Sequence, residues 1–149
     1  MKRVLFLFAI ALLLLGCAQQ EDLTGFKNCG TDKACTALAA KSCEKAFGTV
    51  TQTSTEPSAS MDVKVIIYGF EQSNCRIKYK IENVALDPAN ANNGQLQIMA
   101  AMLQGKEMTC QIPQEQLQSD NLASLPTIDI KTQCSGSLAD VLNQLNSAQ

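Results

Sequence analysis

The chain has 149 residues, of which 46% are hydrophobic and 17% charged, and its formal net charge is −2. It contains no histidine, which excludes Ser–His and Cys–His catalysis. Nucleic acid is not expected as a partner either, because that affinity comes from clustered Lys and Arg side chains that neutralise phosphates, and the sequence has no such cluster.

The N-terminus has the layout of an export signal. Lys2 and Arg3 precede an apolar run over residues 4–15, and small residues follow it. The run is too short for a spanning helix, which needs roughly 20 apolar residues. Its end, Leu-Leu-Gly-Cys at residues 14–17, resembles the lipobox of prokaryotic lipoproteins. The resemblance implies a signal peptide over residues 1–16 and a diacylglyceryl group on the sulfur of Cys17.

A lipid on Cys17 implies an extracytoplasmic protein that is anchored to a membrane without spanning it, because two or more acyl chains give stable attachment. In a Gram-negative cell, Ala18 after the cysteine implies the outer membrane. In a cell with one membrane, the same signal implies the outer face of the cytoplasmic membrane. The alternative is plain secretion with cleavage after Ala18, because residues 16–18 also form a small-x-small site.

Six further cysteines follow Cys17, namely Cys29, Cys35, Cys43, Cys75, Cys110 and Cys134. An even number of cysteines in a small exported domain predicts a disulfide framework. Zinc is the competing explanation, but the chain has no CxxC motif, and structural zinc sites favour closely spaced pairs. We therefore expect three disulfides whose pairing the sequence leaves open, with no metal and no other cofactor.

Residues 17–27 are expected to form a lipidated tether, and residues 28–149 a single small domain. A helix is predicted from Asp32 to Ala46, with Thr31 or Asp32 as its N-cap and Gly48 beyond its end. The apolar stripe of this helix consists of small residues and includes Cys35 and Cys43. The helix is therefore expected to lie close to a sheet and to be joined to it by disulfides.

Alternating side chains predict strands in the middle of the chain. The Thr-rich stretch Thr49–Thr55 predicts an exposed edge strand, whose backbone groups could pair with a strand of a partner protein. Further strands are expected over 62–70, 75–84, 106–112 and within 126–134, with Cys75 and Cys110 on the inward face. The sheet is expected to be antiparallel, with about four or five strands and one face covered.

Helical spacing returns in the second half of the chain. Leu96, Met99, Ala100 and Leu103 lie between Gly94 and Gly105 and predict a short helix whose methionine fills the core. Residues 113–118 are expected to form a helical turn, and a last helix is expected from Ser137. The predicted class is α+β, with the N-terminal helix packed on one face of the sheet, short C-terminal helices and disulfide staples.

No catalytic residue is predicted, because the sequence has no GxSxG and no glycine-rich phosphate-binding motif. The stretch Asn28-Cys29-Gly30-Thr31-Asp32-x-x-Cys35, with Cys43 and residues 108–110, resembles a set of small cysteine-containing exported prokaryotic proteins over residues 28–112. That resemblance implies no particular activity. We expect a non-catalytic binding or structural module at the cell envelope. The alternative is a thiol-redox or soft-metal-handling envelope protein.

Overall fold

The computed structural model describes residues 21–55, 58–90, 92–118 and 129–147. Within these ranges the strands form one six-stranded sheet, in which neighbours follow the order of the sequence. The strands are β1 (Lys27–Gly30), β2 (Ala46–Thr55), β3 (Ser58–Glu71), β4 (Asn74–Leu86), β5 (Glu107–Pro113) and β6 (Cys134–Ser135). The helices are α2 (Lys33–Ser42), α3 (Gly94–Leu103), α4 (Ile130–Gln133) and α5 (Ser137–Ser147), with a 3-10 turn, η1 (Gln114–Gln116).

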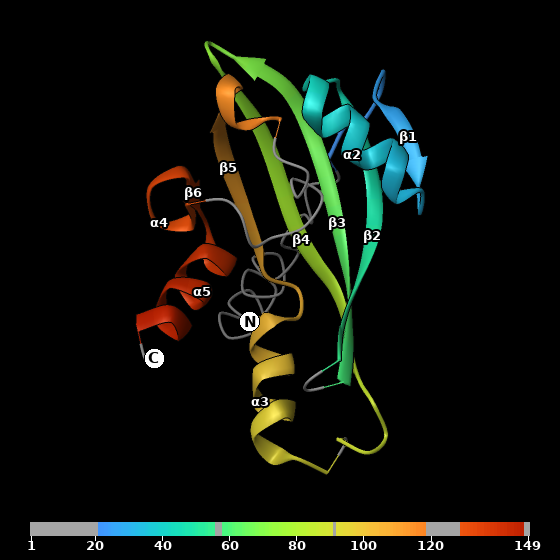
Figure 1. Ribbon diagram of the computed structural model, residues 1–149, viewed down its shortest axis with the longest axis vertical. Helices are drawn as coiled ribbons and strands as arrows, with labels where there is room; N and C mark the ends of the chain where they lie inside the picture. Colours follow the sequence, from blue (N-terminus) through green and yellow to red (C-terminus); the bar gives the residue numbers. More distant parts are fainter. Residues whose placement is uncertain (1–20, 56–57, 91, 119–128, 148–149) are drawn as a thin grey trace, which may run out of the picture.

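The predicted α+β class is confirmed, with its N-terminal helix, short C-terminal helices and disulfides. The sheet is mixed, because β1 runs parallel to β2 whereas each later pair is antiparallel. The short strands β1 and β6 bring the described sheet to six strands, which exceeds the predicted number. Figure 1 shows α2 and α3 near opposite ends of the long axis of the molecule.

The covered face of the sheet carries apolar side chains at alternate positions. Val65 on β3 lies opposite Tyr79 on β4, which lies opposite Met108 on β5, and each is at most 1% exposed. α2 packs on this face through the small residues Thr36, Ala39 and Ala40. α5 contributes the fully buried Leu138. Burying this much apolar surface is the main favourable contribution to folding.

The close contact between α2 and the sheet depends on Gly48 of β2. A Cβ at this position would lie 2.5 Å from the hydroxyl oxygen of Thr36 and 3.0 Å from the carbonyl oxygen of Gly30. The small residues of the predicted helical stripe therefore do let the helix approach the strands closely, but Gly48 serves inside a strand and not as a helix stop.

The helix α2 begins as predicted and ends earlier. Asp32 is its N-cap, and its carboxylate accepts hydrogen bonds from the backbone N–H groups of Ala34 and Cys35. The prediction that the helix continues to Ala46 is wrong, because Cys43 adopts the left-handed conformation with a φ of 51°. Its backbone N–H bonds back to the last turn of the helix, and Ala46 begins β2.

The three disulfides connect neighbouring elements of the fold. Cys29–Cys35 joins β1 to α2, and Cys110–Cys134 joins β5 to β6. Cys43–Cys75 joins the C-cap of α2 to β4, so the expected staple between the first helix and the sheet is confirmed.

The prediction of a strand within 126–134 is wrong for residues 129–133, and residues 126–128 lie outside the described residues. Residues 130–133 form the short helix α4. The backbone N–H groups of Thr132 and Gln133 bond to the carbonyl oxygen of Asp129, and the Thr132 hydroxyl donates to the Asp129 carboxylate at 2.7 Å. These local bonds stabilise a helical turn in place of an extended segment. Cys134 and Ser135 alone form β6.

Candidate functional site

The outer edge of β2 is the first feature of the candidate site. β1 pairs with β2 at residues 46–48 and goes no further, whereas β3 pairs with β2 from Ala46 to Thr55 without a shift in register. Beyond Gly48, β3 is thus the one strand neighbour of β2 among the residues that the structure describes. The predicted strand Thr49–Thr55 is present, and it lies at an edge.

The direction of the backbone along this edge follows from two hydrogen bonds. The Lys45 carbonyl, just before β2, accepts from the N–H of Lys27 in β1, so it points to the outer edge. Residues of a strand face its two edges alternately, so every second residue after Lys45 also points outward. On β3, the Ser58 carbonyl accepts a hydrogen bond from the N–H of Asp87, so the backbone groups of Ser58 point toward β4. They therefore do not bond to its partner Thr55 on β2, and the backbone groups of Thr55 point to the outer edge. Both bonds give the same assignment, in which the outward-facing residues are Thr49, Thr51, Thr53 and Thr55.

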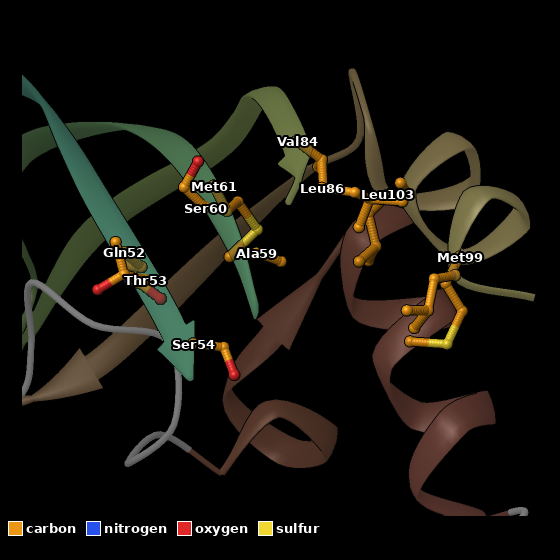
Figure 2. A pocket seen from close by; sticks show the side chains of 12 residues that line it. Gln52, Thr53, Ser54, Ala59, Ser60, Met61, Val84, Leu86, Met99 and Leu103 are labelled. Carbon is orange, nitrogen blue, oxygen red and sulfur yellow. The ribbon is translucent and has the colours of Figure 1, made fainter. Parts of the chain in front are cut away.

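An apolar groove of about 230 Å³ lies beside this edge. Its strand side includes Met61 of β3 and Val84 of β4, its helix side is formed by α3, and residues 52–54 of β2 line it as well. Figure 2 shows Met99 and Leu103 on the helix side of the groove and Met61 on the strand side. Small-molecule sites usually exceed roughly 300 Å³, so this groove has the size for one or two apolar side chains.

The helix α3 has the predicted position and a different environment from the one expected. Asn93 caps it by accepting from the N–H groups of Gln95 and Leu96. None of its residues is buried, and Met99 is 36% exposed. The prediction that Met99 fills the core is therefore wrong, because α3 stands over the open groove at the far end of the sheet. Met108, on the inward face of β5, is buried as expected.

The opposite face of the sheet holds a polar cluster that fixes the start of the described chain. Glu21 accepts a hydrogen bond from the Tyr68 hydroxyl at 2.7 Å and pairs with the Lys78 ammonium at 2.7 Å. Lys78 also lies 3.0 Å from a Glu107 carboxylate oxygen. Phe26 packs edge-on against the Tyr68 ring, with ring centroids 5.9 Å apart. Glu21 and Phe26, which the sequence analysis placed in the tether, thus contact the sheet.

The ionisation of this cluster follows from its surroundings. Partial burial alone raises the pKa of Glu21, but the hydrogen bonds from Lys78 and Tyr68 outweigh it, and the pKa lies below its ordinary value. Burial and the hydrogen bond to Glu21 raise the pKa of Tyr68 to about 12. Glu21 is therefore ionised and Tyr68 neutral near neutral pH, which keeps the hydrogen bond and the ion pair together.

Replacing Glu21 with Gln should destabilise the protein at neutral pH by roughly 1 kcal/mol or less, the usual range for a partly exposed ion pair. A carboxyl whose pKa is lowered by folding stabilises the protein above its unfolded pKa, and this contribution is lost as the pH falls through the folded pKa. The free energies of unfolding of the two proteins, measured with denaturant, should therefore differ at neutral pH. They should coincide well below pH 4.5, which is the ordinary pKa of glutamate. Glu115→Gln, at an exposed residue, is the control and should show no difference at either pH. A difference for Glu21→Gln that persists in acid would contradict the assignment.

The cysteines predicted as disulfide candidates are all paired, and Cys17 lies outside the described residues. In the ranges that the structure covers, no three acidic, Cys or His side chains gather as ligands for a metal ion. No helix in these ranges combines the length and hydropathy needed to cross a membrane. The groove was not predicted from the sequence, although the helical spacing of Leu96, Met99, Ala100 and Leu103 marks the residues that form its helix side.

The fold and the site define a class of protein, a disulfide-stapled α+β domain with an open strand edge beside an apolar groove. Comparisons with protein families, with characterised proteins and with solved structures find no match to this chain.

Proposed function

We propose that this chain is a lipid-anchored, extracytoplasmic binding module without catalytic activity, which holds an extended segment of a partner protein at the outer edge of β2. One observation carries the proposal. The outward backbone groups of Thr51, Thr53 and Thr55 lie beside an apolar groove that residues 52–54 also line. In such strand addition, main-chain hydrogen bonds give affinity, and pockets for alternate side chains give specificity.

The groove lies on one face of the sheet. Every second side chain of a strand added at the outer edge of β2 would point to this face. Because β2 and β3 pair without a register shift, Gln52 and Ser54 are on the same face as Gly48, which packs against α2. A strand added beside them would direct alternate side chains to this face, toward Met61 and α3. The segment we expect is therefore extended, with apolar side chains at alternate positions.

The anchor in this proposal is the lipid on Cys17, and it is supported by the lipobox-like residues 14–17. The disulfides are compatible with an oxidising compartment outside the cytoplasm. Of the two destinations expected from the signal, the outer membrane applies to a Gram-negative cell and the outer face of the cytoplasmic membrane to a cell with one membrane.

The thiol-redox or metal-handling alternative has less support. Each disulfide includes at least one cysteine that is at most 7% exposed. Thiol–disulfide exchange requires access of a thiolate to a disulfide sulfur, and a soft metal requires free thiolates as ligands. The pairing of all six cysteines and the burial of four of them therefore support the binding module over this alternative, while Cys35 and Cys134 are partly exposed.

Replacing Thr53 with Pro should weaken capture of the partner about fivefold, because the variant loses one outward N–H donor worth about 1 kcal/mol. Proline is tolerated at such a position, where its missing donor faces away from the sheet. The measurement is quantitative recovery of the partner from native membranes with the tagged full-length protein.

Thr53→Val is the matched control, because it keeps the N–H group and removes the hydroxyl. It should capture as well as the original protein. Equal capture by the proline and original proteins, or equal loss with proline and valine, would contradict binding through the backbone of β2.

A further inference from the structure

The described chain enters the fold at the middle of one face of the sheet. Glu21 bonds to Tyr68 of β3 and to Lys78 of β4, at 2.7 Å in both cases. Lys78 alternates along β4 with Ile77 and Tyr79, which are buried in the core, so its side chain points away from α2 and the groove. Glu21 therefore lies on the opposite side of the sheet from the helices α2 and α3.

We call this side of the sheet the open face and define it by Lys64, Lys78, Lys80 and Thr109. Lys80 follows Lys78 by two residues, so both side chains point to the same side. In the register of the sheet, Lys64 lies opposite Lys80, and Thr109 lies opposite Lys78. The open face thus extends over β3, β4 and β5 around the point where Glu21 is held.

We propose that the open face is turned toward the bilayer that holds the lipid anchor, at the level of the lipid headgroups, and that α2, α3 and the groove point away from the membrane. This inference rests on the anchor at Cys17 in the proposed function and is independent of partner capture at β2. Its consequence is that a partner approaches the groove from the solvent side of the anchored domain.

The length of the connection to the anchor carries this orientation. Cys17 precedes Glu21 by four residues, which span at most about 14 Å. To place α2 against the bilayer, the connection would first have to run from the middle of the sheet to its edge, about 10 Å over two strand spacings. It would then have to pass a helix about 10 Å in diameter. That path is longer than the connection, whereas the open face lies directly beside Glu21.

The charges of the open face are suited to lipid headgroups. Lys64 and Lys80 occupy directly opposite positions on β3 and β4, where like charges repel each other. The acidic side chains of Glu21 and Glu107 lie beside them, but both are paired with Lys78. A headgroup phosphate near Lys64 and Lys80 would offset their repulsion, and lysines close to an anionic membrane surface are attracted to it.

A second copy of the chain is the competing occupant of the open face, and the distribution of apolar side chains argues against it. The large apolar side chains exposed in the described part of the chain lie on α2, on α3 and at Phe70, whose strand partner Cys75 is buried on the other face. A specific protein interface has an apolar core, whereas lipid headgroups are polar. The polar open face therefore suits headgroups better than a second copy.

The absence of tryptophan from the chain allows a direct test. Lys80→Trp places a single fluorescent donor on the open face, and Leu38→Trp places one on α2, where the leucine is 66% exposed. Thr109→Trp repeats the open-face position on β5 and keeps both Lys64 and Lys80. Each full-length lipoprotein is inserted into preformed vesicles of phosphatidylethanolamine and phosphatidylglycerol, with or without a dansyl acceptor on the headgroup. Flotation of the vesicles reports the anchor separately from energy transfer, and denaturant unfolding identifies the variants that fold.

With the protein floating on the vesicles, the Lys80→Trp and Thr109→Trp emissions should lose most of their intensity to the dansyl acceptor. The Leu38→Trp emission should keep most of its intensity. Where one open-face variant fails to fold, the other decides. Equal transfer from the two faces, stronger transfer from Leu38→Trp, or no transfer from any variant overturns the orientation while leaving the anchor intact. Failure to float contradicts the anchor, and with it the basis of the inference.

Discussion

Replacing Cys43 and Cys75 together with Ala is expected to lower the free energy of unfolding by about 4 kcal/mol. The two residues are 32 positions apart in the sequence, and a loop of this length corresponds to about 3.7 kcal/mol of unfolded-state entropy. The bond also joins α2 to the middle of the sheet, and its cysteines are 5% and 0% exposed. Guanidinium unfolding under non-reducing conditions measures the loss.

The matched control is the double replacement of Cys29 and Cys35, which are six positions apart. The same relation gives about 2 kcal/mol for this shorter loop. Both double variants delete two sulfur atoms near α2. The difference between their losses of unfolding free energy therefore reports the length of the loop that each disulfide closes. Equal losses in the two variants, or a larger loss at Cys29 and Cys35, would contradict the pairing.

Gly136→Ala is expected to cost about 3 kcal/mol in unfolding free energy. Gly136 has a φ of 118°, which L-residues rarely adopt, and an added Cβ would lie 2.7 Å from the Glu107 carbonyl oxygen and 3.1 Å from the Met108 Cα. Backbone strain and overpacking contribute roughly 1–3 kcal/mol each. Both contacts involve backbone atoms, which cannot rotate away as the end of a flexible side chain can. The change should therefore loosen the junction of β6 and α5 from β5.

Gly105→Ala separates the two contributions. Gly105 also has a positive φ, of 75°, but nothing lies within 4 Å of a Cβ built on it. Only backbone strain applies to Gly105→Ala, so we expect the free energy of unfolding to fall by about 1 kcal/mol. Thermal or denaturant unfolding of the two variants tests the difference, and a similar loss in both would show that β5 does not pack against Gly136 as described.

The parts of the fold that the sequence predicted are those with a long local pattern. The alternation from Cys75 to Val84 lies within β4, and the spacing from Leu96 to Leu103 lies within α3. β1 was missed because its four residues have no alternation and form a strand through pairing with residues 46–48. The end of α2 was misplaced because Cys43, and not a glycine, takes the left-handed conformation.

The candidate site was predicted in part. The polar β-branched residues of Thr49–Thr55 indicated an edge strand, since such residues suit an exposed pleated surface. The groove could not be predicted, because it depends on where α3 stands relative to Met61, which lies far from it in the sequence. The same long-range placement leaves Met99 partly exposed, although its spacing suits a core position.

Hydrogen exchange along β2 tests the central claim most directly, in the purified lipoprotein and in its complex with the captured partner. The amides of Thr51, Thr53 and Thr55 should exchange fast in the protein alone and become protected in the complex, because only then do they bond to a strand. The amides of Val50 and Ser54, which face β3 in the assigned alternation, should be protected in both states. Outward amides that stay unprotected in the complex, or that are already protected in the protein alone, would contradict capture by strand addition at this edge.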